Sequence, residues 1–490
     1  MKNIVTLLIL CGLSTALFGQ KLKPGFDKAE YIELLKVSAQ FGGPDYVRAF
    51  PAPQQFKLAY RSPVVGLDNK WDLWTNNQGI GIISLRGTTA NSVSWLGNFY
   101  AAMVPAKGEI QLSDTEKFTY ELAANPRAAV HVGWLVTMGI LAKDILPKID
   151  SCYRAGIKDM LIMGHSQGGS LAFLLTAHLK NLQKRSKIPA DIRFKTYCSA
   201  GPKPGNLPFA YEYEAATQGG WAYNVVNSAD WVPEVPFTVQ TVNDFNPTNP
   251  FVGAPAMIKK QKLLQRIALK YAYNSLSKPA LKAQKNYQKF LGKLASKTVS
   301  KNLNGYVPPE YYKSNDYVRT GTTIVLLADS AYFVKYPDSK DSVFIHHYHP
   351  PYLYLTEKLT LPSNQTDQTS SALLSSSQTL AGTWELNYIS ERKIAFEGLY
   401  PEKKPSITFD LPNQRVNGTT SCNSFNGKLV ADGSKISFTE PMAMTRMMCP
   451  GEGEQAFLDA LKTINRYVVS DDNTLTLLTG DVPVMRFIRK

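Results

Sequence analysis

Ser166 lies between glycines in the segment GHSQGG, which spans residues 164–169. An apolar run of strand length, residues 160–163, precedes this segment, and a helical pattern follows over residues 170–182. A serine on a tight strand-to-helix turn can act as a nucleophile, because small neighbours permit the turn and the helix N-terminus faces the charge that forms during acyl transfer. The same residues also fit an ordinary glycine turn, so the interpretation depends on a base and an acid elsewhere in the chain.

Histidine is the expected base for such a serine. The chain has six histidines: His131, His165, His178, His346, His347 and His349. His165 adjoins the serine and should point elsewhere, and His178 falls about three turns along the following helix. His131, at the start of another helix, fits a structural role. The cluster within residues 345–351 is therefore expected to supply the base. A metal site is the alternative for this cluster, but only Asp341 accompanies it as an acidic ligand.

An acid is expected to orient the base. Asp230 falls on the loop after an apolar strand within residues 224–236, at the C-terminal edge where active sites of open α/β sheets assemble. Glu234, between two prolines on the same loop, is the alternative acid. The order serine, aspartate, histidine along the chain is that of α/β hydrolases.

The elements that must position these residues follow from the hydrophobic pattern. Residues 27–41 show a short helical pattern, and between about residues 71 and 236 runs of strand length alternate with longer helical patterns. Examples are the strand-like residues 80–85 and the helical residues 134–149. This alternation predicts an α/β layer with a mostly parallel sheet.

Five separate stretches, in order along the chain, resemble the class 3 lipase family over about residues 27–357. They are residues 84–88 (SLRGT), 130–134 (VHVGW), 164–169 (GHSQGG), 200–210 (AGPKPGNLPFA) and 225–233 (VVNSADWVP). The resemblance implies an α/β-hydrolase fold for residues 20–360. It also implies an activity, the hydrolysis of carboxylic esters such as those of lipids.

The resemblance also implies roles for individual residues. Ser166 would be the nucleophile and Asp230 the acid. Thr88 would form the oxyanion hole together with the backbone N–H of Gln167, because donors must face the oxygen that becomes negative. The histidine of the family is followed by aromatic and aliphatic residues of a last helix.

His349 fits this description best, since Tyr352, Tyr354 and Leu355 follow it. Two prolines directly after His349 depart from the family pattern. His347, and after it His346, is the alternative base.

An acid-free segment departs from the family pattern. The chain carries a formal net charge of +15, yet residues 245–309 contain no Asp or Glu, and twelve Lys and Arg fall between residues 259 and 301. Helical spacing of apolar residues predicts a basic helical insertion over residues 250–305. Such an insertion could dock on an anionic membrane or lipid surface through residues 259–301, or form a solvated lysine-rich face. Nucleic acid is not expected as a partner, because no aromatic and basic binding module accompanies the charge.

A second domain is expected after a linker rich in Ser, Thr, Gln and Asn over residues 361–378. Residues 379–490 resemble the META domain, a small α+β module, through the segments LAGTW (380–384), VNGTTSCNSFNG (416–427) and MTRMMCP (444–450). With this resemblance, Cys422 and Cys449 are expected to lie close enough to pair. The domain shows no acid–base set, so a structural or interaction role is predicted.

The N-terminus predicts export from the cytoplasm. Lys2 precedes a short apolar run, and residues 1–19 have the dimensions of a secretory signal peptide rather than of a membrane span. The remaining cysteines are four, an even number that suits an oxidising compartment. The mature protein is expected to be secreted or extracytoplasmic.

The sequence thus predicts a secreted serine ester hydrolase that acts on lipid or ester substrates through Ser166, Asp230 and His349. The chemistry requires no metal and no organic cofactor. The alternative hypothesis is a surface- or lipid-binding protein that keeps an inactive hydrolase scaffold.

Overall fold

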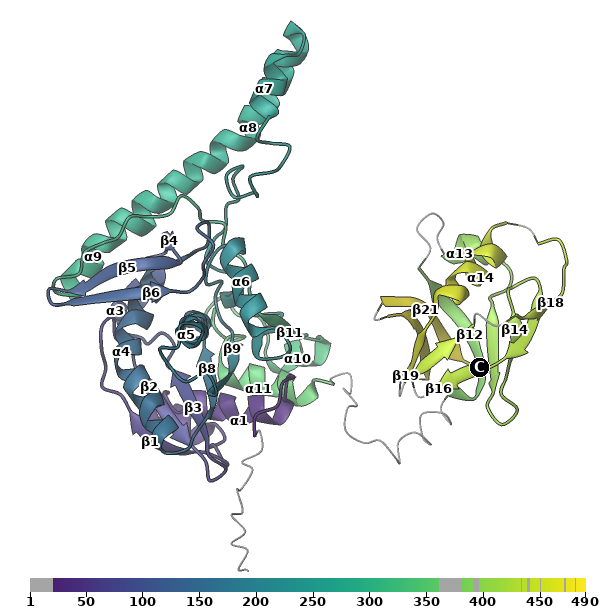
Figure 1. The fold of residues 1–490 in the computed structure, drawn as a ribbon, viewed down its shortest axis with the longest axis horizontal. Coiled ribbons are helices and arrows are strands. Elements are labelled where there is room, and N and C mark those ends of the chain that lie inside the picture. The colour runs from purple at the N-terminus through teal and green to yellow at the C-terminus, as the bar shows by residue number, and fades with distance from the viewer. Residues whose placement is uncertain are drawn as a thin grey trace, which may run out of the picture. The chain divides into compact units, whose positions relative to one another are not determined.

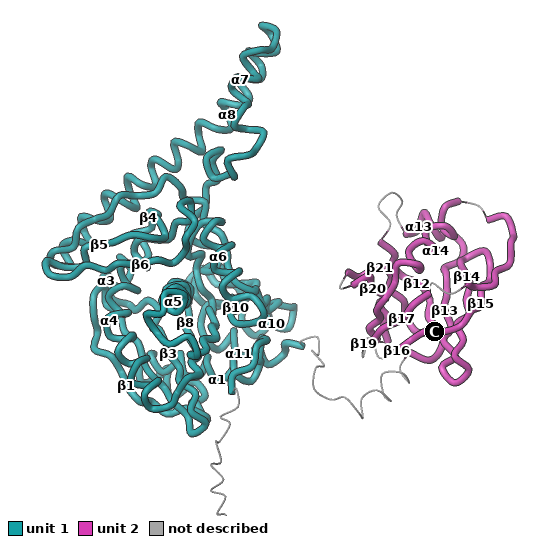
Figure 2. Tube along the Cα trace, in the orientation of Figure 1, with its two compact units in different colours: residues 1–360 teal, residues 361–490 magenta. Residues whose placement is uncertain are grey.

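The chain divides into two compact units, residues 1–360 and residues 361–490 (Figure 2). The computed structural model describes these residues: 21–360, 380–390, 396–432, 434–438, 441–449, 451–470, 473–480 and 482–490. The predicted signal peptide, residues 1–19, and the predicted linker, residues 361–378, lie outside the described residues.

A seven-stranded sheet forms the centre of the first unit (Figure 1). In spatial order its strands are β1 (Lys57–Arg61), β2 (Trp71–Thr75), β3 (Ile80–Leu85), β8 (Asp159–His165), β9 (Arg193–Ser199), β10 (Ala222–Asn227) and β11 (Thr322–Leu326). The pairs β1–β2 and β2–β3 are antiparallel, and all pairs from β3 to β11 are parallel. Every residue of β8 and β10 is buried, as in sheets covered on both faces. The expected mostly parallel α/β sheet is confirmed.

Helices pack on both faces of this sheet. One core contains α4 (Val132–Arg154) and α5 (Gln167–Lys184), and another contains α1 (Lys28–Ala39) and α11 (His349–Lys358). Strand β3 contributes to both cores, because successive side chains of a strand point to opposite faces. Its residues Ile83 and Leu85 lie in the first core, and Ile80 and Ile82 lie in the second.

Shorter elements complete the first unit. They are α2 (Pro44–Ala49), α3 (Ser92–Phe99), α6 (Leu207–Thr217), η1 (Val232–Glu234), α10 (Ser330–Lys335), the pair β4 (Met103–Pro105) with β7 (Ala129–His131), and the hairpin β5 (Lys107–Ser113) with β6 (Glu116–Glu121). Helix α3 follows the end of β3 and packs against α4.

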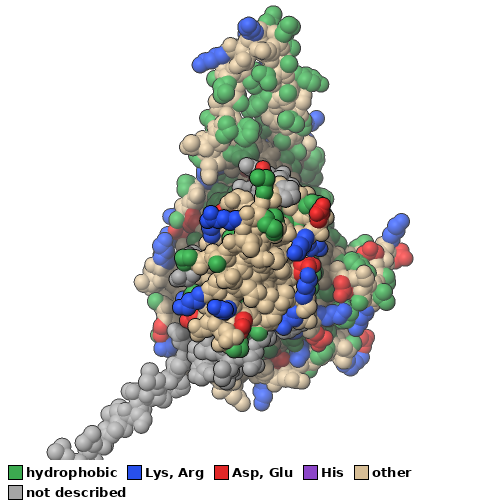
Figure 3. All heavy atoms as spheres, turned by 90° about the vertical axis from the view of Figure 1, so that its right-hand side faces the viewer, with side chains coloured by type: hydrophobic (Ala, Val, Ile, Leu, Met, Phe, Trp, Pro, Cys, Tyr) green, Lys and Arg blue, Asp and Glu red, His purple; other side chains and the backbone are tan. Residues whose placement is uncertain are grey.

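The acid-free segment is helical, as predicted. It contains α7 (Ala254–Lys259), α8 (Leu263–Gln288), the π-helix η2 (Lys289–Leu294) and α9 (Ala295–Asn302). The last three form one continuous helix, about 60 Å long at 1.5 Å per residue, and we call α7 to α9 the arm. Every residue from 259 to 272 is exposed. Figure 1 shows α8 extending away from the sheet, and Figure 3 shows hydrophobic side chains gathered over this projecting part.

In the part of the chain that the structure describes, no helix has both the length and the hydropathy needed to cross a membrane.

The second unit is built on one ten-stranded sheet, mainly antiparallel. In spatial order its strands are β16 (Val430–Asp432), β17 (Lys435–Ser437), β19 (Arg466–Ser470), β20 (Thr474–Thr479), β21 (Val482–Arg489), β12 (Gly382–Ile389), β13 (Ser406–Asp410), β14 (Arg415–Thr419), β15 (Ser424–Lys428) and β18 (Ala443–Met444). Two helices accompany the sheet, α13 (Phe396–Leu399) and α14 (Gly453–Thr463). Phe457 and Leu461, four residues apart on α14, are buried in one core with Trp384.

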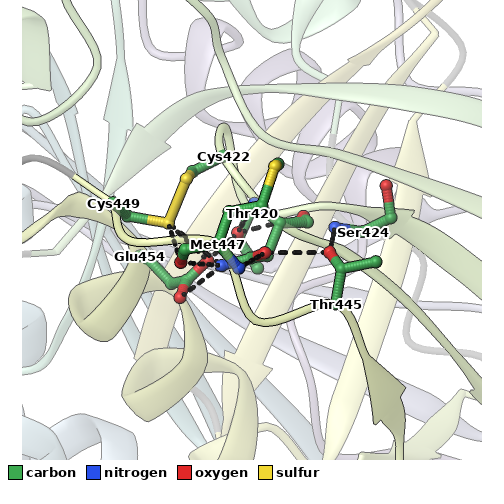
Figure 4. The surroundings of a disulfide bond; sticks show 8 residues. Thr420, Cys422, Ser424, Thr445, Met447, Cys449 and Glu454 are labelled. Carbon is green, nitrogen blue, oxygen red and sulfur yellow. Dashed lines mark hydrogen bonds between the residues drawn. A yellow bond between two sulfur atoms is a disulfide. The ribbon is translucent and has the colours of Figure 1, made fainter.

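Cys422 and Cys449 lie close together, as the resemblance to the META domain implied, and a disulfide joins them (Figure 4). The buried side chain of Asn423 connects the same two segments: its Nδ2 donates to Met447 O at 3.0 Å and to Glu454 Oε1 at 3.1 Å. The cross-link therefore stabilises a loop that already has buried hydrogen bonds. In the first unit, Cys152 and Cys198 are free and buried.

Replacing Cys422 and Cys449 together by serine should lower the free energy of unfolding of the second unit by about 3–4 kcal/mol. The bond closes a loop with a sequence separation of 27, which restricts the unfolded chain. Differential scanning calorimetry of the full-length double variant should show a lower midpoint for one of two transitions. Wild type scanned in a reducing agent should show the same lowered midpoint. Equal midpoints for the double variant and the oxidised wild type would contradict this prediction.

Candidate active site

Ser166 occupies the turn between β8 and α5. Its backbone has φ 63° and ψ −131°, in the left-handed region that non-glycine residues rarely adopt. The neighbouring glycines allow this turn: a Cβ on Gly164 would lie 1.9 Å from Gly168 O, and a Cβ on Gly168 would lie 2.2 Å from Leu85 O. Backbone segments therefore approach so closely that only glycine fits. The predicted strand–turn–helix context of the motif is confirmed.

Two groups beside Ser166 can donate to a developing oxyanion. The N–H of Gln167 belongs to the first residue of α5 and has no acceptor within the helix. Thr88 follows the end of β3, and its Oγ1 accepts a 2.8 Å hydrogen bond from Asn98 Nδ2. The hydroxyl proton of Thr88 consequently remains free to donate to another oxygen.

Asn98 is a site residue that the sequence did not reveal. Its Oδ1 accepts from Trp134 Nε1 at 2.9 Å, and its backbone O accepts from His131 Nε2 at 3.2 Å. Burial lowers the pKa of His131 to about 3. The neutral ring can then donate through Nε2 and accept from Trp134 N through Nδ1, at 3.3 Å. His131 thus has the structural role predicted for it, and through Asn98 it supports Thr88.

The buried carboxylate of Asp230 is hydrogen-bonded to His347. Oδ2 accepts from His347 Nδ1 at 2.7 Å and from the hydroxyl of Tyr352 at 2.9 Å, and Oδ1 accepts from Val232 N at 3.0 Å. A buried carboxylate needs such donors to remain ionised. In the sequence, Tyr352 is only one of the aromatic residues that follow the histidines. No sequence pattern indicates that it contacts Asp230. Glu234, the alternative acid, makes no hydrogen bond with a histidine of the described chain.

The structure places His347, and not the expected His349, against Asp230. His349 begins α11, and both of its ring nitrogens are engaged by other groups: Nδ1 with the hydroxyl of Tyr46 at 2.9 Å and Nε2 with Ser38 Oγ at 3.1 Å. Burial, and secondly the neighbouring His347, lower the pKa of His349 to about 3. A ring so held cannot reach Asp230. The alternative base of the sequence interpretation, His347, is therefore the residue that meets the acid.

His346 and the metal alternative are decided by the same geometry. His346 Nδ1 is hydrogen-bonded to the hydroxyl of Tyr332 at 2.8 Å, and its Nε2 to Asp338 Oδ1 at 3.0 Å. The three clustered histidines thus bind three separate sets of partners, and their ring nitrogens do not converge on one point.

His165, next to Ser166 in the chain, contacts the backbone of His347. It is fully buried, and burial, with the nearby His349 and His347, lowers its pKa well below the usual value. The neutral ring accepts from Ser199 Oγ at 3.0 Å through Nδ1 and donates to His347 O at 2.7 Å through Nε2. Its ring also stacks on His349 with centroids 4.3 Å apart. The side chain of His165 therefore fixes the backbone of His347 beside the serine turn.

Ser166 and His347 line one cavity of about 680 Å³, together with Thr88 and Gln167. Its walls are mainly apolar and aromatic, and include Trp95, Phe99, Trp231, Phe237, Tyr287 and Leu291. Among the described residues no hydrogen bond joins Ser166 Oγ to the ring of His347, and such bonds are often long without substrate. The site thus combines a serine, a histidine hydrogen-bonded to a carboxyl group, and two hydrogen-bond donors in an apolar pocket.

Comparison with known families matches both parts of the chain. Residues 82–240 match the family model "Lipase (class 3)", and residues 378–490 match the model "META domain". No curated protein matches the chain.

Similar solved structures are lipases from fungi. A fungal lipase–inhibitor complex is 19% identical, with 43% of this chain and 74% of that chain covered and a TM-score of 0.34. Lipase II from Rhizopus niveus is 20% identical, with 43% and 74% covered and a TM-score of 0.31. The triacylglyceride lipase of Rhizomucor miehei is 18% identical, with 44% and 77% covered and a TM-score of 0.32.

The free energy of unfolding should fall as the pH drops from about 6.5 toward 4. His131 and His349 have pKa values of about 3 in the folded protein and His178 about 4, against 6.5 for the ordinary side chain. Because the unfolded chain takes up these protons first, each histidine contributes stability that is present above pH 6.5 and is lost at lower pH. The slope is about 1.4 kcal/mol per pH unit for each histidine.

Urea unfolding of the full chain at pH 7, 6 and 5 measures this slope. His349→Gln should reduce the slope by the contribution of one histidine, about 1.4 kcal/mol per pH unit. A stability that does not change between pH 7 and pH 5 would contradict the burial of these neutral rings.

Proposed function

Because residues 82–240 belong to the class 3 lipase family and residues 378–490 are a META domain, we propose that the protein is a secreted serine hydrolase of lipid esters. Ser166 is the nucleophile, His347 the base and Asp230 the acid. One observation carries this proposal: His347 Nδ1 donates to Asp230 Oδ2 at 2.7 Å while the His347 ring and Ser166 line the same apolar cavity.

The proton donors and acceptors of the site define the steps of the reaction. With Nδ1–H of His347 bonded to Asp230, Nε2 carries a lone pair and takes the proton of Ser166 as Oγ attacks the ester carbonyl. The carbonyl oxygen becomes negative, and Gln167 N–H and the Thr88 hydroxyl donate to it. His347 returns its proton to the alcohol oxygen, the C–O bond breaks, and an acyl-enzyme remains. Water, deprotonated by His347, then releases the acid and restores Ser166.

The features of the cavity support a lipid ester as the substrate. An acyl chain needs apolar walls, and aromatic side chains such as Trp95 and Trp231 line the cavity around the serine. The steps described use no metal and no organic cofactor. The expected signal peptide of residues 1–19 and the disulfide of the second unit support an oxidising, extracytoplasmic location.

Removing the nucleophile or the base should abolish ester hydrolysis. We expect Ser166→Ala and His347→Ala each to lower kcat at least about 10³-fold, since members of a triad act as a unit. His349→Gln should retain far more activity, because His349 does not touch Asp230. The assay is hydrolysis of p-nitrophenyl esters of increasing acyl length by the purified mature protein, with circular dichroism as the folding control.

The pair of histidine variants decides between the two bases. An inactive His349→Gln beside an active His347→Ala would return the role of base to His349. If folded wild type turned over no ester of the series, the hydrolase proposal would fail and the binding role on an inactive scaffold would stand.

We further propose that residues 259–301 of the arm dock on an anionic lipid surface. Leu264 is 82% exposed and Tyr271 is 75% exposed, and together with Leu263 and Ile267 they form an apolar stripe at helical spacing. Lys and Arg border this stripe, and the segment has no acidic residue. A basic amphipathic helix of this kind inserts its apolar face at an interface while its charges meet anionic headgroups.

Neutralising two charges of the arm should weaken vesicle binding. Arg266→Gln with Lys270→Gln should reduce the affinity for phosphatidylglycerol vesicles by about thirtyfold, at about 1 kcal/mol per charge. The matched control is Lys184→Gln with Lys187→Gln, two exposed charges on the core of the same unit. Co-sedimentation at low salt measures the affinity. Equal losses in both double variants would indicate a general charge effect and would contradict docking through the arm.

A further inference from the structure

The arm contributes two side chains to the cavity that contains Ser166. Tyr287 and Leu291 line this cavity, although both belong to the insertion that departs from the family pattern. They lie four residues apart, on one face of the helix where α8 passes into η2. A π-helical turn inside a longer helix often marks a functional position.

The C-terminal part of the arm is fixed against the core of the unit. Ala102 N donates to Leu291 O at 3.0 Å, and a Cβ on Gly292 would lie 3.0 Å from Ala102 Cβ, which shows how closely η2 approaches this segment. The amide of Gln288 donates to Tyr312 O at 2.7 Å. Leu291 is therefore held in place by contacts with the core of the unit.

Tyr287 is fixed in a similar way. Its ring contacts the ring of Tyr317 with centroids 6.5 Å apart, and the hydroxyl of the fully buried Tyr317 donates to Ala101 O at 2.7 Å. Ala101 itself lines the cavity. The arm and the segment before β4 thus form one continuous wall.

We propose that Tyr287 and Leu291 form the part of the acyl-binding site that limits the length of the acyl chain. The inference rests on the proposed hydrolase function, because Ser166 must receive the carbonyl of the same substrate. An apolar wall fixed by hydrogen bonds does not yield to a longer chain. Its side chains therefore determine how many methylene groups are accommodated, and single methylene groups change the discrimination of hydrophobic pockets about tenfold or more.

Filling the cavity at Leu291 tests the proposal. In the p-nitrophenyl series, Leu291→Trp should lower the ratio of kcat/KM for laurate to that for butyrate at least about tenfold, and Leu291→Ala should raise it. Leu294→Trp is the matched control: Leu294 lies on the same π-helix but is 55% exposed and does not line the cavity. Its ratio should equal that of wild type. A laurate-to-butyrate ratio that is the same in Leu291→Trp, Leu291→Ala and Leu294→Trp would overturn the proposal.

A binding measurement separates this proposal from the hydrolase function. Calorimetric titration of laurate into the full-length Ser166→Ala protein does not depend on turnover. Adding Leu291→Trp to this protein should weaken laurate binding about tenfold, whereas adding Leu294→Trp should not. If wild type hydrolysed no ester but the laurate affinity still changed at Leu291 alone, the catalytic proposal would fail and the acyl wall would remain. Equal affinities in both double variants would reject the wall even in an active enzyme.

Discussion

The carboxyl group of Asp230 is buried in the interior of the first unit, where such a group is stable only if hydrogen-bond donors surround it. Its donors come from three places in the chain: the following loop through Val232, the turn that holds His347, and the last helix through Tyr352. The hydroxyl of Tyr352 also accepts from Asn227 N, at the end of β10. The buried side chain of Asp230 therefore ties the sheet edge to the C-terminal helix of the unit and holds His347 at the same time.

Neutral histidines complete this arrangement. His165 donates to the backbone of His347 and accepts from Ser199, whose hydroxyl is hydrogen-bonded to Tyr31 at 2.6 Å on α1. The ring of His349 stacks on His165 and binds α1 and α2 through its two nitrogens. Because burial keeps both rings uncharged, they pack beside His347 without placing a positive charge next to it. The surroundings of the site thus distinguish His347, which lines the cavity, from its structural neighbours.

The arm links two different environments through one helix. Its tip is exposed on all sides and carries apolar and basic side chains but no acidic ones. Its C-terminal part lies against Ala102 and contributes Leu291 to the cavity. Since the helix is continuous between these ends, an interface held by the tip would lie at a defined distance from the pocket. Contacts with the core of the unit stabilise this long helix in its C-terminal part, through Gln288, Leu291 and the buried Val299.

Several features follow from the sequence alone, because local patterns determine them. The glycines around Ser166 are required by backbone contacts within the turn, the alternating strands and helices define the parallel sheet, and Asp230 falls where such sheets place their catalytic loops. The helical insertion is likewise recognisable in the sequence, whereas the proximity of Cys422 and Cys449 was implied only by the resemblance to the META domain.

Only the tertiary structure decided which histidine meets the acid. His346, His347 and His349 lie within four residues in a turn and the start of a helix, where side chains point in divergent directions. The direction of each ring is set by partners far away in the chain, such as Tyr46 for His349, about 300 residues earlier. The supporting contacts of Asn98 and the wall formed by Leu291 have the same origin: they are created when distant segments pack together, and no local pattern of residues encodes them.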